Sequence, residues 1–256
     1  MTVFKDVFGR HPRLAAPVCG LLAATGFPPL GLWPLALLAV AGFAWLVWTS
    51  AGWRQAALVG WLFGIAHFTL ANNWIATAFT YQSEMPAALG WAAVPLLSLY
   101  LAVYPAIAAA LARALAPRVT LAAFAPLLGA SWILGEWLRS WVFTGYAWAP
   151  LSLILLGPSG RSGAALSLPL AGTYALSGLL IALATLLLAL ALRKRWVPAA
   201  ALTTVLIGAI IIDPARGDAV RADRDYIVQL SDWTDEDPHR VLSKLKMQGD
   251  YYNYHQ

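Results

Sequence analysis

The segment GEWLRSWVFTGYAWAP, residues 135–150, places an acid and a base three positions apart among aromatic residues. If a helix runs through its first turns, Glu136 and Arg139 share one face and can form an ion pair. The fork of an arginine also binds phosphate or carboxylate groups, which suits a phospholipid headgroup. The alternative is an ordinary charged helix end, anchored by tryptophans at a membrane surface. The candidate binding residues of this segment are Glu136, Trp137, Arg139, Gly145, Tyr146 and Trp148.

A second polar group interrupts a long apolar run, WLFGIAHFTLANNWIATAFTY, residues 61–81. Asn72, Asn73 and Trp74 lie within the helix expected there, and His67 is one to two turns away. Polar side chains at membrane depth face other helices or a wet cavity. They therefore either bond neighbouring helices or line a cavity that a lipid reaches, and Asn73 and Trp74 join the candidate binding residues. A histidine without a nearby carboxylate is weak evidence for catalysis.

Signatures of several enzyme classes do not occur in the sequence. It has no Gly-rich phosphate loop, no GxSxG elbow and no HExxH motif. Its one cysteine, Cys19, lies in the first apolar run, which excludes an intrachain disulfide and a metal cluster built from cysteines. We expect no metal and no cofactor.

Composition places the elements around these residues in a membrane. Hydrophobic residues make up 60% of the 256 residues and charged residues 11%, and the mean hydropathy is +0.67. Soluble domains are about 45–50% apolar and about 25% charged. The formal charge of +5 does not indicate nucleic-acid binding, because most basic residues lie in short loops between apolar runs. The fold class we predict is an all-α polytopic membrane protein with about seven transmembrane helices.

Seven runs fit the pattern of a membrane-crossing helix, which needs about 20 mostly apolar residues. The predicted spans are 14–29, 33–50, 56–79, 87–112, 119–135, 164–192 and 197–212. With the amino terminus inside, the cytoplasmic segments hold nine lysines and arginines, against Arg139 and Arg161 in the opposite short loops. Because basic loops stay in the cytoplasm, we predict the amino terminus inside and the carboxyl terminus outside.

The chain changes character after the last apolar run. Residues 213–256 hold nine of the twelve acidic residues, together with six basic ones, which indicates a soluble segment. A short apolar run, Tyr226–Leu230, predicts a strand, and Asp237 with Pro238 predicts the start of a helix. One strand and one helix cannot bury an independent core. We therefore divide the chain into a transmembrane helical domain, residues 1–212, and a short α/β tail, residues 213–256.

Taken in order, these segments resemble the membrane part of bacterial apolipoprotein N-acyltransferases. The resemblance rests on GFPPLGLWPLALLAVAGFAWL, NNWIATAF, EWLRSWVFTGYAW and a basic RKRW turn, and it covers about residues 12–245. It implies a multi-pass protein of the bacterial inner membrane, in which the orientation predicted from the basic residues puts the carboxyl terminus of this chain in the periplasm. The family transfers an acyl chain from a phospholipid to the amino terminus of a diacylated lipoprotein, so phospholipid and lipoprotein are the implied partners. One departure is that the family usually has Phe-Pro-Trp where this chain has Tyr146, Ala147 and Trp148.

The larger departure concerns the catalytic domain of the family. There, a nitrilase-like domain with a Glu, Lys, Cys set follows the penultimate span; here, DYIVQLSDW resembles its first strand, and the sequence ends at Gln256 before any of the three positions. The resemblance therefore implies a truncated lipid-binding module with no catalytic residue and no independent catalysis. The alternative is a membrane scaffold, or half of a split enzyme, that pairs with a separate nitrilase-like subunit through the strand Tyr226–Leu230. A transporter that uses His67 and the paired asparagines is a third hypothesis, although no pair of broken helices supports it.

Overall fold

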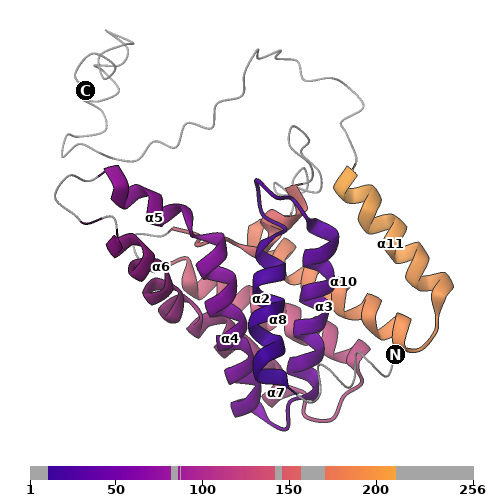
Figure 1. Ribbon diagram of the computed structural model, residues 1–256. Helices are drawn as coiled ribbons and strands as arrows, with labels where there is room; N and C mark the ends of the chain where they lie inside the picture. Colours follow the sequence, from indigo (N-terminus) through magenta and orange to yellow (C-terminus); the bar gives the residue numbers. More distant parts are fainter. Residues whose placement is uncertain (1–10, 82–85, 87, 142–145, 157–170, 212–256) are drawn as a thin grey trace. The chain divides into compact units, whose positions relative to one another are not determined.

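The computed structural model describes residues 11–81, 86, 88–141, 146–156 and 171–211, and the regular structure in these ranges is helical (Figure 1). The α-helices are α2 (Pro12–Ala24), α3 (Trp33–Thr49), α4 (Trp53–Ala71), α5 (Trp74–Ala78), α6 (Ala88–Leu101), α7 (Val103–Leu115), α8 (Leu121–Arg139), α10 (Thr173–Leu192) and α11 (Trp196–Ile211). The short 3-10 helices are η1 (Phe79–Tyr81) and η3 (Leu151–Leu156). The expected helical fold is confirmed for these residues. The predicted strand and helix of the tail lie outside them.

Several helices pack around a shared apolar core. Both α2 and α7 pack on α4, α8 packs on α7 and α10, and α2, α3 and α4 lie side by side in Figure 1. The ring centroid of Phe63 on α4 lies 4.2 Å from that of Phe43 on α3 and 6.1 Å from that of Trp132 on α8. All three side chains are at most 3% exposed. This aromatic cluster, Phe43, Phe63 and Trp132, joins three helices and supports the helix that carries Glu136.

Glycines allow backbone contact between helices at two crossings. A Cβ atom placed on Gly60 of α4 would lie 2.9 Å from the Cα atom of Ala106 and would overlap the carbonyl oxygen of Pro105, both on α7. A Cβ atom on Gly129 of α8 would lie 2.5 Å from the carbonyl oxygen of Gly178 on α10. Small residues let helices approach closely in membranes. The α4–α7 and α8–α10 crossings therefore depend on positions without a side chain.

Replacing Gly60 by alanine is expected to lower the free energy of unfolding by about 1–3 kcal/mol, because the methyl group forces α4 away from the backbone of α7. The measurement is unfolding of the purified chain in detergent by added dodecyl sulfate, followed by circular dichroism. Gly52→Ala is the matched control, since a Cβ atom there meets nothing within 4 Å. Equal stability of the two variants would show that α4 and α7 do not pack this closely.

Within the part of the chain that the structure describes, three helical stretches are long and apolar enough to cross a membrane: Ala88–Leu115, Leu121–Arg139 and Thr173–Leu192. The first of them is α6 followed directly by α7. These stretches overlap three of the predicted spans, and the shorter apolar helices α2 and α3 overlap two more. The helices thus lie where the apolar runs predict them, while the number of crossings and the orientation stay predictions.

The predicted helix 56–79 is wrong in one respect, because it is broken at the paired asparagines. α4 ends at Ala71, and the short α5 begins at Trp74. Asn72 has backbone angles φ −107° and ψ 17°, which do not continue the helix. Asparagine side chains compete with the backbone for hydrogen bonds and so favour helix ends over helix interiors. Asn72 therefore lies at a helix end rather than inside a long span.

One arginine connects two helix ends. Arg113, in the last turn of α7, donates from Nε to the carbonyl oxygen of Ser50 at 2.7 Å and from Nη1 to that of Ala116 at 3.1 Å. Ser50 directly follows α3, and Ala116 directly follows α7. Carbonyl groups at the carboxyl ends of helices have no partners within their own helix. Arg113 supplies donors to both ends at once.

Candidate functional site

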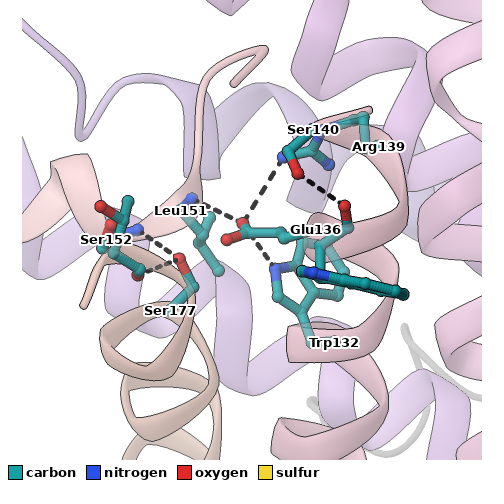
Figure 2. A network of polar contacts seen from close by, with 9 residues as sticks. Trp132, Glu136, Arg139, Ser140, Leu151, Ser152 and Ser177 are labelled. Carbon is teal, nitrogen blue, oxygen red and sulfur yellow. Dashed lines mark hydrogen bonds and ion pairs between the residues drawn. The ribbon is translucent and has the colours of Figure 1, made fainter. Parts of the chain in front are cut away.

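Glu136 accepts two hydrogen bonds at one carboxylate oxygen (Figure 2). Its Oε1 atom accepts from the indole Nε1 of Trp132 at 2.9 Å and from the backbone N–H of Leu151 at 2.8 Å. The Nη2 atom of Arg139 lies 3.6 Å from the same oxygen. The predicted ion pair is therefore confirmed. Because Leu151 begins η3, the carboxylate also binds the start of that element to α8.

The ion pair is buried. Glu136 and Arg139 are each 1% exposed, and the guanidinium carbon lies 4.8 Å from the ring centroid of Phe68 on α4, a cation–π contact. The interpretation as an ordinary charged helix end at the membrane surface is therefore wrong. The spacing of two residues along a helix identifies their shared face but not the elements that cover it. Here α4 and the start of η3 cover this end of α8.

Ser152, the residue after Leu151, is also held by a hydrogen bond. The backbone N–H of Ser152 donates to Oγ of Ser177 on α10 at 2.9 Å, and this hydroxyl donates to the carbonyl oxygen of Thr173 at 3.3 Å. Leu151 and Ser152 are thus bound to two different helices through successive N–H groups. We call the residues that precede them, 146–150, the wall segment. Its carboxyl-terminal end is fixed by α8 and α10 together.

The wall segment forms one side of a cavity of about 490 Å³. Trp148 and Ala149 have φ angles of 49° and 54°, a left-handed conformation that non-glycine residues seldom adopt. The ring centroids of Tyr146 and Trp148 lie 5.0 Å apart, with the rings nearly perpendicular. The end of α4 and the turn after α2 also contribute lining residues. Besides the wall segment, the lining includes Phe27, Pro28, Asn72, Trp74 and Thr173.

Three predicted binding residues, Trp74, Tyr146 and Trp148, meet around this cavity. Glu136 and Arg139 are not among its lining residues. Glu136 acts on the cavity indirectly, because it holds the residue that follows the wall segment. The predicted binding residues therefore include some that line the cavity and others, such as Glu136, that hold the wall segment in place.

The remaining predicted residues lie elsewhere. Asn73 lines a second cavity, of about 180 Å³, together with Thr77 and Trp91. Trp137 is 46% exposed and makes an edge contact with the ring of Trp141, with centroids 5.9 Å apart. Gly145 lies outside the described residues.

Sequence reasoning missed Phe27, Pro28 and Thr173 as lining residues. The proline-rich stretch around Pro28 predicts a tight hairpin, but no periodicity connects it with a segment more than a hundred residues later. Asn72 is a polar residue in an apolar run, and the preference of asparagine for helix ends is the sequence signal that selects it as a lining residue. His67 is 1% exposed and has three phenylalanine rings at centroid distances of 5.3–5.7 Å, so it is a core residue.

Known proteins are similar to this chain over most of its length. The pattern of the family described as "Apolipoprotein N-acyltransferase N-terminal domain" matches residues 19–186. An apolipoprotein N-acyltransferase of Ralstonia nicotianae is 36% identical over 202 residues, which is 76% of this chain and 38% of that protein. One of Vibrio vulnificus is 28% identical over 246 residues, 96% of this chain and 44% of that protein. The chain thus spans about two fifths of the length of these curated relatives.

A further match is short. Copper resistance protein A of Escherichia coli is 57% identical over 47 residues, 18% of this chain and 8% of that protein. A match of that extent assigns no function here. The family match, in contrast, includes every residue that lines the larger cavity, as well as Glu136 and Arg139. The chain belongs to the apolipoprotein N-acyltransferase family.

Proposed function

We propose that these helices form the lipid-binding membrane part of an apolipoprotein N-acyltransferase, which takes an acyl chain from a phospholipid for transfer to the amino terminus of a diacylated lipoprotein. The observation that carries the proposal is the cavity between the end of α4 and the wall segment. Its aromatic rings suit acyl chains, and Trp74 and Tyr146 remain 49% and 40% exposed, so a lipid can reach it from outside. Ligand sites in proteins measure about 300–1,000 Å³, a range that includes this volume.

The transfer step itself needs a nucleophile, a base and a donor for the developing oxyanion. In the resembled family this nucleophile is a cysteine, and the one cysteine of the sequence, Cys19, is buried within α2 at 1% exposure. We therefore assign lipid binding, rather than the transfer step, to these 256 residues. In this proposal a nitrilase-like domain, on the same chain or on a separate subunit, supplies the nucleophile.

The proposed setting is the bacterial inner membrane, crossed seven times, with the amino terminus inside and residues 213–256 outside. The three long apolar helices support a multi-pass arrangement. The excess of basic residues in the predicted cytoplasmic segments, nine against two, supports the orientation. The wall segment would then lie toward the outer side, where the family resemblance places the transfer chemistry.

Replacing Trp148 by alanine is expected to reduce lipid capture at the cavity roughly fivefold or more, because a large aromatic contact surface is lost. The measurement is photo-crosslinking, in nanodiscs, of the chain to a phosphatidylethanolamine that carries a diazirine in one acyl chain. Mass spectrometry then counts adducts on the wall segment and on the end of α4. Trp141→Ala is the matched control, since Trp141 is 73% exposed and does not line the cavity.

Two outcomes separate specific binding from general contact with lipid. Adducts concentrated at the cavity in the native chain and in Trp141→Ala, but not in Trp148→Ala, support the proposal. Adducts spread evenly over the apolar helices and unchanged in both variants would contradict it. Unfolding curves of the variants show whether any loss arises from misfolding.

A further inference from the structure

Asn72 presents a buried amide at the cavity. Its side chain is 1% exposed and lines the cavity, and among the described residues no group accepts a hydrogen bond from its Nδ2 atom. Its backbone N–H donates to the carbonyl oxygen of Phe68 at 2.9 Å, so the end of α4 holds the residue in place. Buried polar groups in proteins are nearly always hydrogen-bonded, so an unpartnered amide beside a cavity points to an acceptor on a ligand.

The character of the cavity restricts that acceptor to an uncharged group. None of the described lining residues is an acid, a lysine, an arginine or a histidine. The nearby charges of Glu136 and Arg139 are paired with each other and do not line the cavity. A phosphate placed there would be buried without a counter-charge, which is unfavourable. A carbonyl oxygen has no such penalty.

We propose that the Asn72 amide donates a hydrogen bond to an ester carbonyl oxygen of an acyl glycerolipid bound in the cavity. The inference rests on the proposed function and adds to it the part of the lipid that this site recognises, namely the acyl ester rather than the headgroup. The last torsion of an asparagine side chain is broad, so in this proposal the amide turns about the Cβ–Cγ bond to direct Nδ2 at the bound lipid. The recognised bond is the one that acyl transfer breaks, which gives selectivity for lipids able to donate an acyl chain.

The test compares two phosphatidylethanolamines with equal chains, one with ester linkages and one with ether linkages that lack the carbonyl oxygens. Each competes with the diazirine lipid for crosslinking at the cavity of the native chain in nanodiscs. The ester lipid is expected to compete about fivefold better, the usual effect of one hydrogen bond. Asn72→Leu, which keeps the size of the side chain, should remove the difference. Gln55→Leu, which removes an exposed amide from the other end of α4, should preserve it.

The outcomes distinguish this inference from the proposed function. Crosslinking at the cavity with equal competition by ester and ether lipids overturns the role of Asn72 and leaves lipid binding intact. No crosslinking of the diazirine lipid at the cavity, even without a competitor, overturns both. Because the comparison of the two lipids on the native chain needs no variant, it decides the question even if Asn72→Leu does not fold.

Discussion

Replacement of Glu136 by leucine is expected to lower the free energy of unfolding by about 3–5 kcal/mol, the usual effect of removing one partner from a buried ion pair. The change leaves the guanidinium of Arg139 buried at 1% exposure without its counter-charge. It also removes the acceptor of the indole N–H of Trp132 and of the backbone N–H of Leu151. The wall segment then loses its bond to α8, so lipid crosslinking at the cavity should fall as well.

The measurement is unfolding by dodecyl sulfate in detergent, with Arg139→Leu and the double variant Glu136→Leu/Arg139→Leu beside the single one. The double variant has no unpaired buried charge. Its loss of unfolding free energy should therefore be clearly smaller than the sum of the losses in the two single variants. A loss below about 1 kcal/mol in Glu136→Leu would place the pair in the range of exposed salt bridges and contradict its burial.

Replacement of Phe63 by alanine is expected to lower the free energy of unfolding by about 3–5 kcal/mol, because it opens a cavity at a fully buried position. Phe63 is 0% exposed and contacts the rings of Phe43 and Trp132. Trp132 is the donor to Glu136, so the loss of its neighbour loosens a group that positions the site. The aromatic cluster thereby connects core packing with the geometry of the wall segment.

The unfolding assay described for Glu136 checks this prediction, and Phe63→Leu is the control. Leucine fills much of the space of the ring, so more than half of the stability lost in Phe63→Ala should return. Equal stability of Phe63→Ala and the native chain would show that the three rings do not form a common core.

The sequence predicted helices well and helix ends less well. Apolar runs of about 20 residues identify helices because a helix of that length crosses a hydrocarbon core of about 30 Å. The end of such a run depends on contacts with other elements. α8 continues past the predicted boundary at residue 135 to Arg139, whose guanidinium makes a cation–π contact with Phe68 of α4. α4 stops earlier than its apolar run predicts, because Asn72 favours a helix end.

The pairing of Glu136 with Arg139 followed from their spacing, but their roles did not. Burial of the pair depends on residues from α4 and from the start of η3, and spacing within one helix contains no information about them. The conformation of Trp148 is a second example. Its positive φ angle is typical of glycine, so the type of side chain does not predict this backbone conformation.

The two carbonyl groups held by Arg113 have a consequence for engineering the orientation of this protein. The same residue contributes to the basic bias from which the cytoplasmic side is inferred. Lysine would keep that charge, but its single ammonium lacks the planar fork that reaches the ends of α3 and α7 together. Exchanging arginine for lysine at this position therefore keeps the positive charge that orients the chain during insertion, but removes the hydrogen bonds that join the ends of α3 and α7 in the folded protein.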